Sequence, residues 1–452
     1  MSARVQEDVA GRLNLTFDDI GEQNLKNIAR SVRVYRVRLS ATRSTPSGAP
    51  IRATLSLPEK PSIAVLPFQN MSGDPEQEYF ADGMVEEIIT ALSRIRWLFV
   101  IARNSSFTYK GQSVDVKQIG RELGVRYVLE GSVRKASQRV RITGQLIDAL
   151  TGAHLWADRF DGSLEGIFEL QDMVAVRVAG VIEPTLQAAE IRRSSERPTN
   201  DLTAYDLYLR ALPHISPMAK KDDTLRALDL LARAIEVDPR FGPALALSAN
   251  CCVHFNTYGW GDDREVNRRK GVNFARRALQ VPEDDPFVLA NAGYVLGRLG
   301  EDIDAAIALV NRSLELNPSF ARGWHWAGWL SIQAGHPSVA MEHFKTSSRL
   351  SPRDQTGMNL TGMGVSHFFN KRFEDAAASL LISLQHLSTW VVTYRFLASS
   401  YAHMGRLSEA RDIVQKLRTL TPFVVPSVPP YRNPEHRKLF LSGLRLAADE
   451  TT

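Results

Sequence analysis

Cysteine is scarce in this 452-residue sequence: it contains only Cys251 and Cys252, which are adjacent. Adjacent cysteines cannot link distant parts of a chain, so a disulfide framework is excluded. No run of about 18 apolar residues is free of charge, which excludes a membrane-spanning helix. The first 25 residues have early acids and no apolar segment, so we expect no signal peptide and a cytoplasmic, reducing location.

The sequence also lacks the short motifs that usually mark a catalytic or cofactor site. It contains no phosphate-binding loop, no G-x-G-x-x-G after a strand, no H-E-x-x-H, no C-x-x-C and no G-x-S-x-G. We therefore expect no cofactor, no metal and no catalytic residue. Acids between Asp74 and Glu87 could suggest a cation site, but an acidic helix start explains them better. Cys251 and Cys252 are interpreted as core residues of a helix.

Charge and composition narrow the class of protein further. The chain is 44% hydrophobic and 23% charged, which excludes wholesale disorder, and its length suits several domains. The net charge of +5 comes mostly from the first 60 residues, which hold 10 Lys/Arg against 6 Asp/Glu. Because this surplus follows a strand-like run and a linker rather than one face of a folded domain, we expect no nucleic-acid partner.

The N-terminal region is too short to form a domain by itself. Residues 32–38 alternate Val or Tyr with Arg, which predicts a strand with one wet face, and residues 18–29 suggest a turn and a connector. About 38 residues rarely bury a sufficient core. We therefore interpret 1–38 as the end of a larger domain, and the Ser/Thr/Pro-rich segment 39–60 as a linker.

Residues 61–190 alternate between strand and helix patterns. The expected strands are 62–67, 97–102, 127–135, 139–147 and 154–160, and the expected helices are 78–94, 114–123 and 164–190. Two βα units followed by hairpin-connected strands predict a compact α/β domain with a mixed sheet.

Residues 200–425 contain a repeat. Counted from Ala321, small residues and a closing proline recur at positions 8, 15, 20, 27 and 32, namely Gly328, Gly335, Ala340, Ser347 and Pro352. The same offsets return from Gly357 and Val391, although Lys371 replaces a turn glycine and Leu417 a small residue. The period matches the 34-residue tetratricopeptide repeat, a pair of antiparallel helices. The fold class is thus α/β plus all-α: an α/β domain, an α-solenoid of about six units, and a tail over 426–452.

Three segments together resemble a known family. Residues 11–37, GRLNLTFDDIGEQNLKNIARSVRVYRV, resemble the closing strands of the class III adenylate/guanylate cyclase domain. Residues 61–183 resemble a TolB amino-terminal-like domain, notably in SIAVLPFQNMSGDPEQEYFADGMVEEI, YVLEGSVRK and GAHLWADRFDG. With the repeats, the chain resembles the C-terminal portion of a bacterial multidomain cyclase of this class.

The resemblance implies little chemistry for this chain. The family's metal-binding aspartates, purine-reading residues and Asn/Arg pair lie upstream of the preserved tail. Lys26 stands where the family has a lysine that contacts the triphosphate, but without the rest of the domain it has no phosphate to hold, so a solvated lysine beside a turn is the favoured interpretation. We therefore expect no enzyme activity in the isolated chain. A fragment, a frame-shifted locus or a non-catalytic descendant would all give such a sequence.

The repeats predict a binding surface, because first helices of stacked pairs line a concave groove at their positions 2, 5, 9 and 12. The predicted groove residues are Tyr294, Arg322, His325, Trp329, Ile332, Val392, Arg395 and Ser399. Trp324, at position 4, is expected to pack between helices. Arginine and aromatic side chains can hold a peptide carboxylate or an apolar side chain.

Our hypothesis is a non-catalytic interaction or regulatory module that binds a protein or peptide in cyclic-nucleotide signalling. The alternatives are an adenylate cyclase whose catalytic part is missing or supplied in trans, and a periplasmic component with a TolB-like domain. The expected absence of a signal peptide disfavours the periplasmic reading. The sequence leaves the partner and the oligomeric state open.

Overall fold

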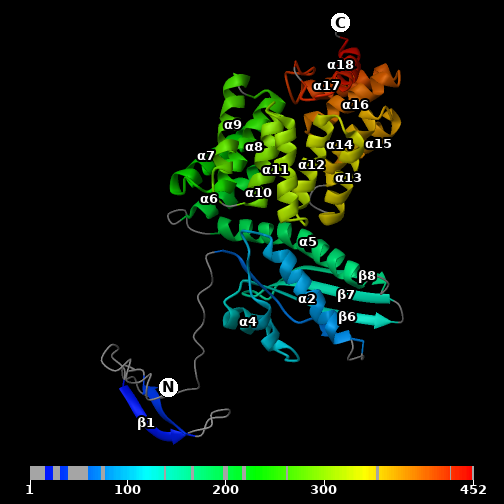
Figure 1. Ribbon diagram of the computed structural model, residues 1–452. Helices are drawn as coiled ribbons and strands as arrows, with labels where there is room; N and C mark the ends of the chain where they lie inside the picture. Colours follow the sequence, from blue (N-terminus) through cyan, green and yellow to red (C-terminus); the bar gives the residue numbers. More distant parts are fainter. Residues whose placement is uncertain are drawn as a thin grey trace. The chain divides into compact units, whose positions relative to one another are not determined.

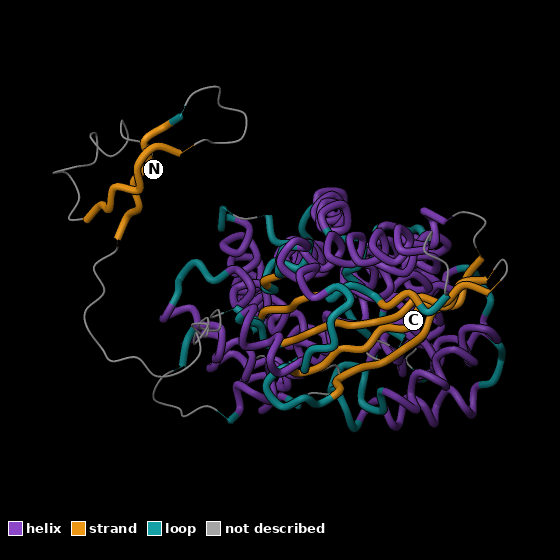
Figure 2. Tube along the Cα trace, turned by 90° about the horizontal axis from the view of Figure 1, so that it is seen from below, coloured by secondary structure: helices purple, strands orange, loops and turns teal. Residues whose placement is uncertain are grey.

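The computed structural model describes most of the chain (Figures 1 and 2). The described residues are 16–23, 31–38, 60–72, 77–136, 139–163, 167–196, 202–215, 220–260, 263–282, 284–352, 356–427 and 429–449. The chain divides into two units, Met1–Ala53 and Thr54–Thr452. Lys26 and the expected linker, apart from Lys60, lie outside the described residues.

In the first unit, β1 (Thr16–Gln23) and β2 (Val32–Arg38) form an antiparallel pair. The predicted strand at 32–38 is confirmed, but the prediction of a turn beginning at residue 18 was wrong. Residues 18–23 belong to β1 because they pair with β2, and Arg33 forms an ion pair of 2.7 Å with Asp19. Gly21, with a φ of +79°, lies at an irregularity in the pairing.

The second unit begins with the α/β domain. Its elements are β3 (Ser62–Val65), β4 (Gln69–Asn70), α2 (Gln77–Ser93), β5 (Phe99–Val100), α3 (Arg103–Ser106), η1 (Phe107–Tyr109), α4 (Val116–Leu123), β6 (Tyr127–Ala136), β7 (Arg139–Asp148), β8 (His154–Ser163) and α5 (Ile167–Ser195). The predicted helices and strands are present, although the strand expected at 97–102 is only two residues long. The short elements β4, α3 and η1 were not predicted.

The sheet of this domain is mixed, as expected. Its strand order is β5-β3-β6-β7-β8, with β3 parallel to both neighbours and β6, β7 and β8 antiparallel. One face packs on α2 and α5, where Met84, Ile88 and Val178 are buried among strand residues. The other face packs on α4 through Ile119 and its neighbours. Burial on both faces explains why β3 is a continuous apolar run.

Helix α5 lies between the sheet and the repeats (Figure 1). At its C-terminal end the Glu190 carboxylate accepts hydrogen bonds from Arg126 (3.1 Å) and from the Tyr127 hydroxyl (2.7 Å), both on or beside β6. Midway along α5, a Cβ at Gly180 would lie 3.0 Å from the Leu350 carbonyl oxygen, in the repeats. The absence of a side chain at Gly180 therefore lets α5 approach the repeat array closely.

The array consists of successive antiparallel helix pairs. They are α6 (Ala204–Ala211, followed by η2, Leu212–His214) with α7 (Lys221–Val237), α8 (Gly242–Tyr258) with α9 (Arg264–Leu279), α10 (Pro286–Arg298) with α11 (Ile303–Leu316), α12 (Ala321–Ala334) with α13 (Pro337–Leu350), α14 (Thr356–Phe369) with α15 (Phe373–His386), and α16 (Val391–His403) with α17 (Leu407–Arg418). This is a tetratricopeptide-repeat α-solenoid. Lys371, in the turn where a glycine was expected, adopts a φ of +59°.

Small residues at the repeat positions set the helix spacing. A Cβ at Gly328 would lie 2.6 Å from the Phe344 ring, and one at Gly362 would lie 2.3 Å from the same ring. Phe344 is fully buried between α12 and α14. The two glycines therefore provide the space that this ring fills, which explains the small residue at position 8 of the unit that begins at Ala321; Gly362, at position 6 of the next unit, is an additional small residue.

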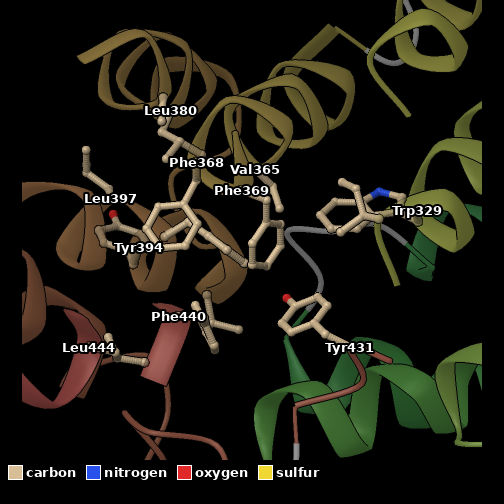
Figure 3. Close-up of a cluster of buried hydrophobic side chains, with 14 of the residues drawn as sticks. Trp329, Val365, Phe368, Phe369, Leu380, Tyr394, Leu397, Tyr431, Phe440 and Leu444 are labelled. Carbon is tan, nitrogen blue, oxygen red and sulfur yellow. The ribbon is translucent and has the colours of Figure 1, made fainter. Parts of the chain in front are cut away.

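The expected tail contains a further helix, α18 (Pro434–Ala448), packed on α16. Phe440 of α18 stacks on Phe396 with ring centroids 4.5 Å apart, and Leu444 is fully buried. Figure 3 shows Phe440 and Tyr431 lying toward the aromatic side chains of α14 and α16. The C-terminal segment is thus part of the core of the array.

We predict that Gly362→Ala lowers the free energy of unfolding by about 1–2 kcal/mol, because the Phe344 ring must move to admit a methyl group. Urea denaturation measures the change. Combining the substitution with Phe344→Leu should cost less than the sum of the two single changes, since the smaller side chain makes room. Additive costs would contradict this account of the spacing.

Candidate functional site

The concave face of the array is closed by the chain itself. The Tyr258 hydroxyl, at the end of α8, donates to the Thr389 carbonyl oxygen before α16, at 3.3 Å. A non-helical segment between α17 and α18, which we call the C-terminal strap (described residues 421–427 and 429–432), then lies against α8, α12 and α16. First helices from both halves of the array therefore surround a common interior.

A small cavity of about 60 Å³ in this interior has aromatic walls. Tyr294 of α10 stacks on Trp326 of α12 with ring centroids 3.8 Å apart, and Trp329 meets Trp390 edge-on at 6.0 Å. The buried Nε1 of Trp326 and Oε1 of Gln333 have no hydrogen-bond partner among the described residues. The cavity therefore offers one unpaired donor and one unpaired acceptor in a wall that also contains polar side chains, among them Asn250 and Arg298.

His325, at the base of this cavity, belongs to a buried polar chain. Trp329 Nε1 donates to His325 Nε2 at 3.1 Å, so His325 Nδ1 carries the proton and donates to Asn359 Oδ1 at 2.7 Å. Asn359 Nδ2 donates in turn to the Ser347 hydroxyl, 3.1 Å away. Complete burial lowers the pKa of His325 to about 3, so the imidazole is neutral.

Arg395 of α16 holds the strap through main-chain atoms. Its guanidinium donates to the carbonyl oxygens of Phe423 (2.7 Å), Val424 (3.2 Å) and Thr257 (3.4 Å). The side chain is almost completely buried, and this burial, with the neighbouring charge of Arg298, lowers the pKa of Arg395 to about 10. Its charge is compensated by carbonyl dipoles, because each of these three hydrogen-bond partners is a carbonyl oxygen.

A second cavity, of about 450 Å³, opens beside the strap. Its walls carry several arginines and one acid; the lining includes Arg264, Glu265, Arg268, Arg298, Val392, Arg395, Pro426 and Pro430. Glu265 and Glu301 engage Arg268 at 2.8 and 3.0 Å. Because Arg268 takes up the acidic charge, Arg264 and Arg298 leave the wall electropositive.

The structure brings together only some of the predicted groove residues. Tyr294, His325, Trp329 and Val392 line the small cavity, and Val392 and Arg395 line the larger one. Arg322 lies elsewhere, near Tyr208 of α6: burial raises the pKa of the Tyr208 hydroxyl, and the Arg322 charge only partly opposes that rise. Ile332 is in the hydrophobic core, and the Ser399 hydroxyl donates to the Phe440 carbonyl oxygen at 3.3 Å.

The expectation of an open groove therefore needs correction. Five of the eight predicted side chains are buried against the chain's own residues: His325, Trp329, Ile332, Arg395 and Ser399. The strap and α18 cover Arg395 and Ser399, whereas His325 and Trp329 pack against the neighbouring repeat helices, at Asn359, Phe344 and Trp390. The strap was not predicted from the sequence, although the prolines at 426, 429 and 430 indicate a non-helical segment.

The other sequence candidates have structural explanations. Cys251 and Cys252 are buried, unpaired thiols, and burial raises the pKa of Cys252 to about 11. Lys110 forms ion pairs with Glu78 and Asp82 of α2, at 2.9 and 2.7 Å. The described residues include no cluster of side chains suited to hold a metal ion. Trp324 packs as expected, and its Nε1 donates to the Pro318 carbonyl oxygen at 2.9 Å.

A further cavity of about 670 Å³ lies where the α/β domain meets the first repeats. Tyr205 and Phe241 line it, as do Arg126 and Glu190. These two charges are already paired with each other, and Glu190 also accepts from Tyr127. This cavity therefore belongs to the joint between the two regions. Among the described helices, none has the length and the apolar run needed to cross a membrane.

The chain resembles known proteins in two separate respects. Residues 59–177 match the second domain of HilA/YgeH-like transcriptional regulators. Over 304 residues the chain is 41% identical to a Rhizobium meliloti (strain 1021) protein named "Putative adenylate cyclase 3". The matched region is 67% of this chain and 52% of that protein. The chain thus spans about half the length of the curated relative it matches.

Solved structures resemble each part of the chain. A tetratricopeptide repeat protein from Parabacteroides merdae ATCC 43184 is 16% identical with a TM-score of 0.32, over 55% of this chain and 87% of that chain. TolB from Acinetobacter baumannii is 18% identical with a TM-score of 0.22, over 30% of each chain. At these TM-scores the likenesses add nothing to the fold described above.

We predict that the free energy of unfolding decreases as the pH falls below about 6.5, because His325 is buried in its neutral form. Its pKa in the folded protein is below the unfolded value, so protonation favours the unfolded chain, and the stability present above pH 6.5 is lost on acidification. The contribution between pH 7 and pH 5 is about 2 kcal/mol. Urea denaturation at the two pH values measures it. His325→Gln should remove this part of the pH dependence, whereas His336→Gln, at an exposed residue, should leave it intact; equal slopes in all three proteins would contradict the prediction.

Proposed function

We propose that this chain is a non-catalytic interaction module whose repeat array binds an extended segment of a protein partner on its concave face. The observation that carries the proposal is that this face already holds a non-helical segment, through Arg395 and the carbonyl oxygens of Phe423 and Val424. Hydrogen bonds to main-chain atoms do not depend on side-chain identity, so another chain could make them. The tetratricopeptide fold is in general a protein-binding fold.

The two adjoining cavities support this proposal. The larger one is electropositive at Arg264 and Arg298, and the smaller one offers the Trp326 donor and the Gln333 acceptor. Together they suit a peptide that carries an acidic group and a small polar side chain. Among the eight residues predicted from sequence, we assign direct partner contacts to Tyr294, Val392 and Arg395, and supporting roles to His325 and Trp329.

The proposed biological setting is cyclic-nucleotide signalling in the bacterial cytoplasm. The name of the Rhizobium meliloti relative and the cyclase-like residues 11–37 support this setting. The proposed organisation is a cyclase-domain remnant (1–38), a linker (39–60), a TolB amino-terminal-like domain (61–190), the repeats (200–425) and the C-terminal segment (426–452). The α/β domain would act as a rigid base for the array, because Gly180 and Glu190 of α5 fix the joint.

The alternative function is adenylate cyclase activity, with the catalytic part missing here or supplied in trans. It is supported by the name of the relative, of which this chain spans about half. The cyclase resemblance carries one catalytic-domain residue, Lys26, to this chain, and a single lysine cannot position metal ions and a nucleotide.

We predict that the purified chain makes no cyclic nucleotide above a buffer blank from ATP or GTP with Mn²⁺ or Mg²⁺. The assay should include Lys26→Ala. Product that this substitution abolishes would show catalytic residues in the N-terminal unit and overturn the non-catalytic proposal, whereas product that it leaves unchanged would indicate contamination.

Partner binding is tested by photo-crosslinking in the bacterium of origin. A benzophenone amino acid replaces Val392, which lines both cavities, or Val339, which is 51% exposed on α13. We expect a protein to crosslink from residue 392 and not from residue 339. Arg298→Glu should reduce this crosslinking severalfold, whereas Arg349→Glu, on the exposed side of α13, should not. Crosslinking that is equal at both positions, or absent from both, would contradict binding on the concave face.

A further inference from the structure

The C-terminal strap is held like a bound peptide. The Thr421 hydroxyl donates to the Tyr258 carbonyl oxygen at 2.9 Å, and Arg264 donates to the Ser427 hydroxyl at 3.2 Å. At the other end, the Arg432 backbone N–H donates to the Gln333 carbonyl oxygen at 2.7 Å. These contacts join the strap to α8, α9 and α12 rather than to its neighbours in sequence.

The composition of the strap indicates which kind of chain this surface accepts. The strap reads TPFVVPSVPPYR, with prolines at 422, 426, 429 and 430. Proline has no N–H to donate and favours extended polyproline II conformations, which present carbonyl oxygens outward. Arg395 donates to the carbonyl oxygens of Phe423 and Val424, next to Pro422, and the rings of Phe369, Phe396 and Phe440 lie around Tyr431. Donors that face carbonyl oxygens, with aromatic walls, are the usual means of recognising proline-rich segments.

One aromatic anchor and one exposed ion pair fasten the end of the strap. The Tyr431 ring is buried against Phe369 and Phe440, with ring centroids 4.9 and 5.8 Å apart. Figure 3 shows Tyr431 lying between the α14 helix and Phe440. Arg432 pairs with Asp304 at 2.9 Å, with exposed fractions of 49% and 70%. An ion pair this exposed contributes little stability. Most of the resistance to opening at this end therefore comes from the buried Tyr431 ring and from the main-chain hydrogen bonds to Gln333 and Arg437.

The strap also leaves space beside it. Pro426, Ser427 and Pro430 form one wall of the 450 Å³ cavity, so one side of the strap is uncovered where a competing chain would first make contact. A segment that served only as core filling would be enclosed on all sides.

We propose that the strap is a displaceable internal ligand, and that the partner segment is itself proline-rich and non-helical, with an aromatic residue near its end. This inference rests on the proposed function and names the chemistry of its partner. The partner takes the main-chain contacts of Arg395 and the aromatic site of Tyr431. The apparent affinity then scales with the fraction of molecules in which the strap is open.

The test uses the full-length chain and a labelled peptide of its own strap, TPFVVPSVPPYRN (residues 421–433), followed by fluorescence anisotropy. Releasing the strap should tighten binding of this peptide. We expect Arg432→Ala to bind it roughly two- to fivefold more tightly than the wild type, and Tyr431→Ala at least about tenfold more tightly. Adding Arg395→Ala to Arg432→Ala should abolish binding.

Two controls separate displacement from general loosening. Arg411→Ala breaks an ion pair to Asp449 of matching exposure, 49% and 61%, away from the strap, and should leave peptide affinity unchanged. A peptide with alanine at the four proline positions should bind more weakly. Hydrogen exchange of the strap should be faster in Arg432→Ala and in Tyr431→Ala than in the wild type, and unchanged in Arg411→Ala. Should Tyr431→Ala fail to fold, Arg432→Ala decides the outcome, because it alters an exposed side chain.

Equal peptide affinity in wild type, Arg432→Ala and Arg411→Ala, or no binding to any of them, would overturn the inference and show a fixed strap. That result is distinguishable from failure of the proposed function. A protein crosslinked from residue 392 equally in wild type and Arg432→Ala would leave partner binding standing without displacement. Absence of any crosslinked protein would count against partner binding, whatever the peptide does.

Discussion

The architecture of the repeat array depends on close contact between helices at positions that cannot hold a side chain. Gly328 and Gly362 leave space for the Phe344 ring. Gly180 leaves space for the Leu350 main chain, where α5 meets the array. Close packing of this kind sets the rotation between each helix pair and the next. Repeated along the chain, this rotation curves the array. The curvature brings Tyr258 at the end of α8 to Thr389 before α16. Everything described on the concave face follows from this closure.

Closure changes what the concave face can do. An open array would offer a wide groove lined by solvated side chains. Here the groove is narrow, aromatic and already occupied, and its polar groups are arranged in buried chains such as Trp329, His325 and Asn359. Buried polar groups with complete hydrogen bonding fix one geometry, so the interior is organised before a ligand arrives. Arg395 differs from these groups. Two of the carbonyl oxygens that balance its charge belong to the C-terminal strap, which we propose can be displaced.

The α/β domain and the repeats form one continuous structure through α5, whose Glu190 carboxylate is held by Arg126 and Tyr127. This joint uses the charged residues that would otherwise have suggested a ligand site there. The similarity of residues 59–177 to the second domain of HilA/YgeH-like regulators, and of a longer region to a cyclase-named protein, shows related segments in differently named proteins.

Periodicity alone determined much of this protein. The sequence predicted a mixed sheet, the long helices and the register of the repeats from Ala321. It could do so because apolar spacing and small residues depend on local structure and on packing between nearest neighbours. The two-residue strand β5, the strand β1 and the burial of the predicted groove residues could not. These depend on pairing or closure between segments distant in sequence: Asp19 with Arg33, Tyr258 with Thr389, and Arg395 with the strap. A repeat pattern fixes how each unit meets the next, whereas only the accumulated curvature of the whole array decides whether its inner face is open to solvent or covered by the chain's own end.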